Sequence, residues 1–176
     1  MNAVDLLEAQ HREIEKLFKA VSGADRSSEK ARLFQELASK LVGHDAIERQ
    51  ILYPECEETL GMSDELGEAL VEHGVIEFAL FQADQALGTP EFAYKVKVLK
   101  ELVEHHVKEE EGEFFPKVRK AIAKDELESL GEELEEAFED SLEGDYHAPL
   151  FDNLRQVLAG VLKPVPRREA DLDARN

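Results

Sequence analysis

The segment HDAIERQILYP (residues 44–54) is the most informative about the fold, because its pattern recurs as HVKEEEGEFFP at residues 106–116. Shifting the sequence by 62 positions superimposes polar and structural positions together: His44 on His106, Glu48 on Glu110, Pro54 on Pro116, His11 on His73, Ile14 on Ile76 and Glu15 on Glu77. A repeat of this length indicates two copies of one supersecondary unit.

Four segments with helical periodicity lie between these landmarks. They are separated by turn-like stretches: GADRSS (23–28), LGMSD (60–64) and LGTPE (87–91). Ser63 and Thr89 are expected to be N-caps. Each copy of the repeat is therefore a helical hairpin, and the fold class is all-α, an up-down-up-down four-helix bundle with additional C-terminal helices.

The periodicity also predicts which residues face the core. In the first helix His11 lies on an apolar seam between Leu7 and Ile14, with steps of three and four residues. The second and third helices repeat this pattern. The core-facing polar positions are His44 and Glu48 in the second helix, and His73 and Glu77 in the third.

The fourth helix has two rival seams. One carries Val103, His106 and Glu110, and the other carries Leu102, His105 and Glu109. Periodicity alone does not choose between them. The 62-residue offset favours His106 and Glu110, which leaves His105 beside the site or at the surface.

Composition and charge narrow the function classes. The 176 residues favour one well-cored domain, and a net charge of −19 disfavours nucleic acid and membrane surfaces as partners. The single cysteine, Cys56, cannot form an internal disulfide, and the N-terminus lacks the pattern of a secretory signal. A cytoplasmic location is expected.

The repeat ends near residue 122, so residues 1–122 are predicted to form the four-helix bundle, which contains all the core-facing histidines and glutamates named above. Residues 123–162 are predicted to be a C-terminal helical extension with an amphipathic helix that carries Leu127, Leu130, Leu134, Phe138 and Leu142 on one side, followed by a short helix at about 149–162. Residues 163–176 have the composition of a disordered tail. The extension is a candidate to gate the site, to cover it or to form a homodimer contact.

The core-facing histidines and glutamates need a common explanation, because burying one such group without a partner costs several kcal/mol. A pair of divalent cations keeps imidazoles neutral and carboxylates ionised in one dry space. The four-residue step from His44 to Glu48, and from His106 to Glu110, places both side chains on one helical face. His11 and His73 would complete the two ligand sets. Donors of this kind, without thiolate, suit iron, with manganese and zinc as competitors.

With these residues identified, the chain resembles the hemerythrin-like HHE cation-binding family over about residues 6–120. The segments that carry the resemblance are HREIEKLF (11–18), HDAIERQILYP (44–54), EHGVIEFALF (72–81) and EHHVKEEEGEFFP (104–116). The resemblance implies a centre of two iron ions, oxo- or hydroxo-bridged, that meets dioxygen, peroxide or nitric oxide. By motif position, the histidine ligands are His11, His44, His73 and His106, and the bridging carboxylates are Glu48 and Glu110.

Two departures from the oxygen-carrying hemerythrins bear on function. Glu77 stands where those proteins have a histidine, four residues after the third-helix histidine, and is a candidate terminal ligand. Glu110 follows His106 by four positions, whereas the family places an aspartate five positions after its histidine; His105 would restore the five-residue step. The Glu-x-x-His spacing of ferritin-like proteins occurs once among the candidates, at Glu8 and His11, which makes that reading weaker.

Three functions remain in competition. The first is a protein that binds dioxygen, peroxide or nitric oxide, or that senses or stores iron. The second is an enzyme that consumes peroxide. The third is a metal-free helical interaction module. Glu15 is expected at the solvated edge of its seam, Asp45 beside the site or exposed, and the Tyr53 phenol is placed either near the site or in end packing.

Overall fold

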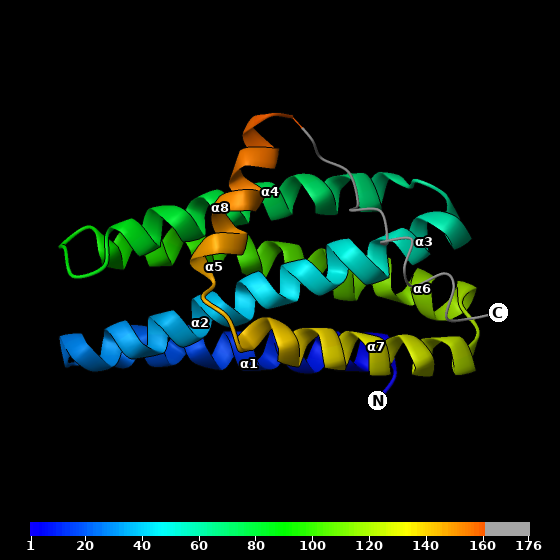
Figure 1. The fold of residues 1–176 in the computed structure, drawn as a ribbon, viewed down its shortest axis with the longest axis horizontal. Helices are drawn as coiled ribbons and strands as arrows, with labels where there is room; N and C mark the ends of the chain where they lie inside the picture. The colour runs from blue at the N-terminus through cyan, green and yellow to red at the C-terminus, as the bar shows by residue number, and fades with distance from the viewer. Residues whose placement is uncertain (161–176) are drawn as a thin grey trace.

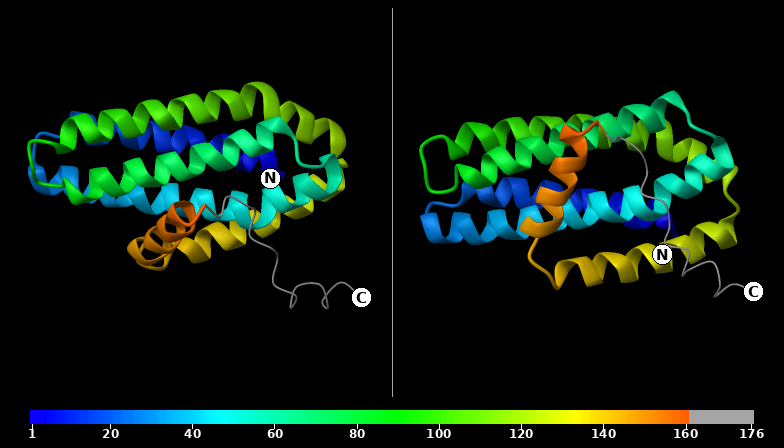
Figure 2. Two further views of the ribbon diagram at one scale, coloured as in Figure 1. Left: turned by 90° about the horizontal axis from the view of Figure 1, so that it is seen from above. Right: turned by 45° about the horizontal axis from the view of Figure 1, so that its top comes forward.

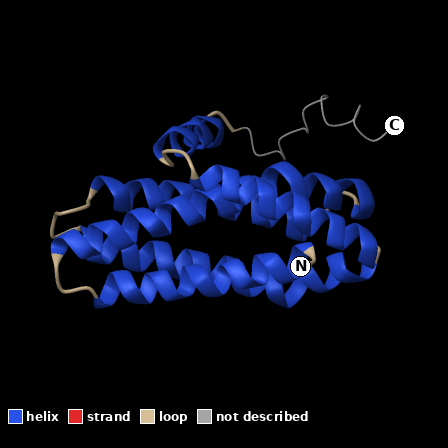
Figure 3. Ribbon diagram, turned by 60° about the horizontal axis from the view of Figure 1, so that its bottom comes forward, coloured by secondary structure: helices blue, strands red, loops and turns tan. Residues whose placement is uncertain are grey.

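The computed structural model describes residues 1–160, and these residues contain helices, turns and bends but no strand. In chain order the helices are α1 (Ala3–Gly23), α2 (Ser27–Ile47), η1 (Glu48–Leu52), α3 (Tyr53–Leu60), α4 (Asp64–Gln85), α5 (Phe92–Glu109), η2 (Glu110–Phe114), α6 (Phe115–Ala121), α7 (Lys124–Leu142) and α8 (His147–Leu158). The all-α prediction is confirmed (Figures 1 and 3). The tail predicted at 163–176 lies outside the described residues.

Two helical hairpins form the bundle. α1 packs against α2, and α4 packs against α5. α3 continues α2 beyond η1, and α6 continues α5 beyond η2, so the bundle has four long helical rods (Figure 2). No helix within residues 1–160 combines the length and the apolar character needed to cross a lipid bilayer.

The apolar core is divided into two clusters by a polar layer. One cluster contains Leu7, Leu52 and Leu70, and the other contains Phe18, Leu37 and Leu99. His11 lies in α1 between Leu7 of the first cluster and Ile14 of the second. The layer of buried histidines and glutamates therefore crosses the bundle between two apolar regions, each of which excludes water from one side of it.

A five-residue π-helical segment begins at each of two buried glutamates. Tyr53 N–H donates to the Glu48 carbonyl across η1, and Phe115 N–H donates to the Glu110 carbonyl across η2. Pro54 and Pro116, which cannot donate a backbone hydrogen bond, follow at the starts of α3 and α6. Sequence predicts a kink or helix end at each proline, and the structure places an expanded turn just before it.

The N-cap predictions have different outcomes. The Ser63 side chain accepts a hydrogen bond from Leu66 N–H and caps α4, as predicted. Thr89 does not cap α5, which begins at Phe92 after Glu91. Instead, Thr89 Oγ1 donates to the Ala86 carbonyl, so the threonine stabilises the preceding turn.

The C-terminal helices pack on the outside of the bundle. α7 lies against α1 and α2 and buries Leu127, Leu130, Leu134 and Phe138, whereas Leu142 at its end is exposed. α8 crosses the bundle and packs on α4, with Leu150 and Leu154 buried (Figure 1). The extension thus covers two different faces of the bundle.

Substituting Gly131 tests the docking of α7. A Cβ at this position would collide with the Met1 carbonyl oxygen and press on the backbone of Asn2 and Ala3, so the N-terminus would have to move. We expect Gly131→Ala to lower the free energy of unfolding by about 1–3 kcal/mol. Gly67→Ala on α4, where a Cβ meets open space, should raise it by up to about 1 kcal/mol. Urea unfolding measures both, and equal midpoints would contradict the docking.

Candidate metal centre

Four histidines from the four rods of the bundle converge in the polar layer. His11 comes from α1, His44 from α2, His73 from α4 and His106 from α5, and all four are buried. Each occupies an apolar seam, so the same periodicity that buries the neighbouring Leu and Ile side chains carries the imidazole inward.

The four imidazoles direct their Nε2 atoms toward one another. His11 Nε2 lies 3.0 Å from His44 Nε2, and His73 Nε2 lies 3.0 Å from His106 Nε2. The histidines are therefore arranged as two pairs, one from each hairpin of the bundle.

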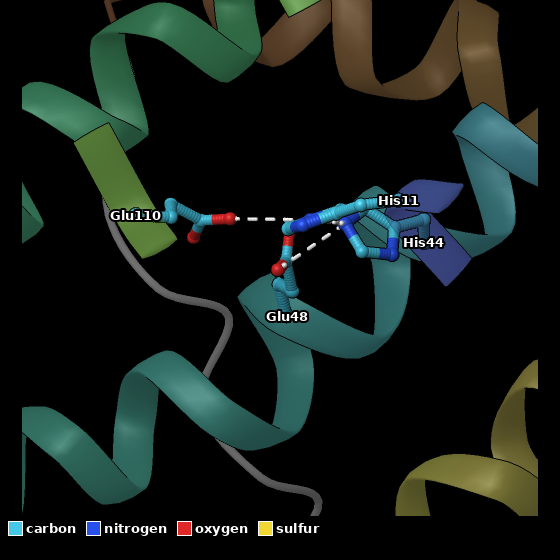
Figure 4. Close-up of side chains that lie close together, drawn as sticks. All are labelled: His11, His44, Glu48 and Glu110. Carbon is cyan, nitrogen blue, oxygen red and sulfur yellow. Dashed lines mark hydrogen bonds and ion pairs between the residues drawn. The ribbon is translucent and has the colours of Figure 1, made fainter. Parts of the chain in front are cut away.

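Glu48 and Glu110 connect the two histidine pairs. Glu48 Oε1 lies 3.3 Å from His44 Nε2, and its other oxygen lies 3.3 Å from His73 Nε2. Glu110 Oε2 lies 3.5 Å from His11 Nε2 and 3.4 Å from His106 Nε2. Figure 4 shows both carboxylates reaching toward the first pair. Ligand atoms within 4.8 Å of one another form two groups that share both glutamates: His11, His44, Glu48 and Glu110, and Glu48, His73, His106 and Glu110.

The buried carboxylate oxygens lack the hydrogen bonds that burial normally requires. Glu48 is fully buried and neither of its oxygens accepts a hydrogen bond, and Glu110 Oε2 accepts none. Burial, together with the nearby Glu110, raises the pKa of Glu48. For Glu110, burial opposes ionisation, but His106 and His11 outweigh it and hold its pKa well below the usual range. Carboxylate oxygens that lack hydrogen bonds and face imidazole nitrogens are suitable donors to a cation, so this layer is suited to metal binding.

The outer nitrogen of every clustered histidine meets an oxygen acceptor. The Nδ1 contacts are His11 to Glu111 (2.9 Å), His44 to Gln10 (2.7 Å), His73 to Asp45 (2.5 Å) and His106 to Glu72 (2.8 Å). A hydrogen on Nδ1 satisfies each contact and leaves the Nε2 lone pair facing the centre. Such bonds fix the tautomer and the ring orientation of metal-binding histidines.

Two of these acceptors are related by the internal repeat, although the sequence analysis did not single them out. Gln10 precedes His11, and Glu72 precedes His73, 62 positions later; each supports the histidine of the neighbouring helix in its own hairpin. The 62-residue offset of the repeat is the sequence signal that could have identified Gln10 and Glu72. Glu111, from the opposite hairpin, has no repeat counterpart of the same chemistry because Arg49 occupies the matching position.

Tyr53 and Phe115 occupy matching positions in the repeat but differ at the site. Tyr53 is fully buried; its hydroxyl donates to Glu110 Oε1 at 2.8 Å and lies 2.9 Å from His73 Nε2. Phe115 instead stacks on His11, with ring centroids 5.9 Å apart. The alternative that placed the Tyr53 phenol near the site is the one the structure supports.

Glu77 is buried beside the two groups without belonging to either. Its Oε1 accepts hydrogen bonds from Asn153 Nδ2 at 2.5 Å and Arg49 Nη1 at 3.4 Å, while Oε2 has no hydrogen-bond partner. Burial, followed by the nearby Asp45, raises the pKa of Glu77 to about 8. A ligand role for Glu77 stays a prediction.

Asn153 connects the C-terminal extension to this layer. Its Nδ2 also donates to Asp45 Oδ2 at 3.1 Å, and the other Asp45 oxygen supports His73. Asp45 is therefore buried beside the site, which was one of its two expected positions. No sequence pattern could have related Asn153 to His73, because α8 lies outside the repeat.

Removing the Asn153 amide should weaken metal binding through Asp45 and His73. We expect Asn153→Leu to lower affinity for Co²⁺ by about tenfold, the lower end of the effect of losing an outer hydrogen bond. Asp152→Ala, one residue earlier on the exposed side of α8, should leave affinity unchanged. Competition against a chromophoric chelator measures both, and equal affinities would show that α8 does not support His73.

Several other candidates lie outside the two buried ligand groups. His105 is exposed, with Nε2 3.3 Å from both Glu72 and Glu109, so the structure brings His106 and not its neighbour into the cluster. Glu15 pairs with Lys19 at the surface. Cys56 is buried away from both groups, and burial raises the pKa of its thiol to about 12.

A small cavity adjoins the histidine pairs. Its volume is about 30 Å³, which is enough for at least one water-sized molecule. Apolar side chains make up most of its wall, including Leu41, Leu80 and Val103, and all four clustered histidines and Glu77 also line it. Glu48 and Glu110 do not line this cavity.

A four-helix bundle with a buried histidine–glutamate layer suited to cations defines the class of this protein. The model of the hemerythrin HHE cation binding domain matches residues 2–118, and the chain belongs to that family. A crystal structure of a hemerythrin HHE cation binding domain-containing protein from Mycobacterium kansasii is similar, with a TM-score of 0.75 and 26% identity over 88% of this chain and 99% of that one. The expected family and fold are thus confirmed.

A curated relative is much longer than this chain. It is a DNA nickase of Nostoc sp. (strain PCC 7120 / SAG 25.82 / UTEX 2576), 25% identical over 138 residues. The match covers 78% of this chain but only 39% of the nickase.

Proposed function

We propose that this chain is a non-haem di-iron protein that binds a small molecule such as dioxygen, peroxide or nitric oxide. The observation that carries the proposal is the sharing of Glu48 and Glu110 by the two buried ligand groups. Two carboxylates common to two pairs of imidazoles are suited to hold two cations side by side. Iron is favoured over zinc and manganese by the mixed imidazole and carboxylate donors without thiolate.

The residues around the layer support small-molecule binding in particular. When bound, two iron ions would supply Lewis acidity and redox capacity at positions not filled by protein atoms. The cavity beside the histidines can hold a molecule of about the size of water, and its wall is mostly apolar. The Nδ1 contacts hold the four imidazoles in place, and the hydrogen bond from the Tyr53 hydroxyl holds the Glu110 carboxylate.

Stopped-flow mixing of the iron-loaded protein with hydrogen peroxide tests the proposal. A binding protein gives one spectral change, stoichiometric with the centre, and nitric oxide should give a second, distinct one. Purified protein should carry about two iron equivalents. Protein made in iron-supplemented cells that carries no metal would overturn the proposal and favour the metal-free module.

Glu77 favours a second candidate, a peroxide-consuming enzyme. Glu77 is one of the residues that line the cavity, and its raised pKa of about 8 lets it hold a proton near neutral pH. Many turnovers of peroxide without loss of the centre would establish this activity. Glu77→Gln, which removes the titratable proton but keeps the shape of the side chain, should then abolish turnover and leave the iron content unchanged.

DNA nicking is not part of the proposed function. The net charge of −19 opposes binding to a phosphate backbone, and the shared region is less than half of the nickase. The expected partners remain small molecules.

A further inference from the structure

A second group of potential metal ligands lies at the surface, close to the buried layer. His105 and Glu109 are one turn apart on α5, and Glu72 faces them from α4. The His105 Nε2 atom is 3.3 Å from a carboxylate oxygen of each glutamate. Ligand atoms of all three residues lie within 4.8 Å of one another. The group combines an imidazole with carboxylates, as the buried groups do.

This surface group borders an acidic pocket that reaches the buried layer. The pocket has a volume of about 200 Å³ and lies between α4 and the α5–η2 rod. Six glutamates line it: Glu65, Glu68, Glu72, Glu109, Glu110 and Glu113. Lys117 pairs with Glu65 at one side. The concentration of carboxylates attracts cations and disfavours anions.

Glu110 connects the pocket with the buried layer. It lines the pocket, yet its side chain is only 2% exposed, and its Oε2 atom, which has no hydrogen-bond partner, faces His11 and His106 of the layer. The exposed fraction falls from 41% for Glu109 to 21% for Glu72 and then to 2% for Glu110. The three carboxylates therefore form a graded series from solvent to the centre.

Glu72 contacts the surface and buried groups at once. One of its oxygens lies 3.3 Å from His105 Nε2, and the other lies 2.8 Å from His106 Nδ1. A change in the surface contacts of Glu72 can thus alter its contact with His106, because the two contacts use the same carboxylate.

The other opening near the layer is less suited to cations. A pocket of about 310 Å³ between α1 and α5 includes His11 in its wall. Its charged residues are balanced: Arg12, Lys100 and Lys108 against Glu15, Glu104 and Glu111. A divalent cation approaching the protein is drawn more strongly to the acidic pocket.

We propose that Glu72, His105 and Glu109 form a transfer site that captures a divalent cation and passes it to the buried centre by way of Glu110. The transfer is an exchange of ligands without electron transfer: oxygen and nitrogen donors of the surface group are replaced one by one by those of the layer. The proposal rests on the proposed metal-binding function of the layer and specifies how the layer is loaded.

The rate of Co²⁺ uptake tests the transfer site. Metal-free protein is mixed with Co²⁺ at low ionic strength, and the visible absorption of bound Co²⁺ is followed by stopped flow. The double variant His105→Ala/Glu109→Gln should load about tenfold more slowly or worse, because focused charge raises association rates by roughly 10- to 1000-fold. Its final Co²⁺ content and spectrum should equal those of the wild type.

Glu15→Gln/Glu104→Gln is the matched control at the other opening. It removes two carboxylates, one more than the test variant, so a general effect of net charge would slow the control more. Near wild-type loading by this control supports the transfer site. Equal slowing of both variants, unchanged loading by the test variant, or a lower final Co²⁺ content in it would each overturn the proposal. A wild-type protein that binds no Co²⁺ would overturn the proposed function as well.

Discussion

Glu48→Leu is expected to abolish two-metal binding while making the metal-free protein more stable. Both Glu48 oxygens face imidazole nitrogens in both ligand groups, so its loss removes a donor from each. The same oxygens are fully buried without hydrogen bonds. An apolar side chain removes that penalty, and we expect the free energy of unfolding of metal-free protein to rise by about 1–3 kcal/mol.

The two opposite effects make this prediction specific. Metal analysis should show a fall from about two equivalents to nearly none, and thermal unfolding should no longer respond to added metal. In the wild type, metal at about 100 times its dissociation constant should stabilise the fold by about 2.7 kcal/mol per site. Glu15→Leu, which changes the partly exposed repeat counterpart of Glu77, should keep both metals. A Glu48→Leu protein that retains two equivalents would refute the bridging role.

His106→Ala and His105→Ala should differ sharply although they change neighbouring residues. His106 contributes Nε2 to the second ligand group, whereas His105 is 61% exposed and contributes to neither buried group. A set of four structural zinc ligands supplies roughly 10–16 kcal/mol, so one ligand carries a few kcal/mol, or about a hundredfold in affinity. His106→Ala should therefore hold about one equivalent at micromolar metal.

The measurement is metal content at equilibrium after dialysis, which does not depend on the rate of loading. His105→Ala should bind as much metal as the wild type, and His44→Ala should lose as much as His106→Ala. Equal losses in His105→Ala and His106→Ala would contradict the assignment that the internal repeat favours.

The sequence predicts the polar layer well because the layer follows from spacing along the chain alone. Histidines that interrupt an apolar seam must enter the core wherever the helix packs, and the offset of 62 positions sets them at matching depths. The choice of His106 over His105 follows from the same argument. These positions depend on helical geometry and not on the details of any one contact.

The surroundings of the layer could not be predicted in the same way. Glu111 reaches His11 from the opposite hairpin, and Asn153 reaches Asp45 from α8, so both contacts depend on how distant helices are docked. The sequence also does not predict the type of turn before Pro54. Proline disfavours a regular helix but does not specify the π-helical turn that replaces it. Sequence periodicity describes a helix, whereas these features arise between helices or where the helix is irregular.

The two halves of the layer are related by the repeat but have different surroundings. The first histidine pair is supported by one neutral amide and one carboxylate, from Gln10 and Glu111, and Phe115 stacks on it. The second pair is supported by two carboxylates, from Asp45 and Glu72, with the Tyr53 hydroxyl beside it. Because the neighbours of the two pairs differ, two ions held in this layer would occupy inequivalent positions, despite the internal repeat that relates their ligands.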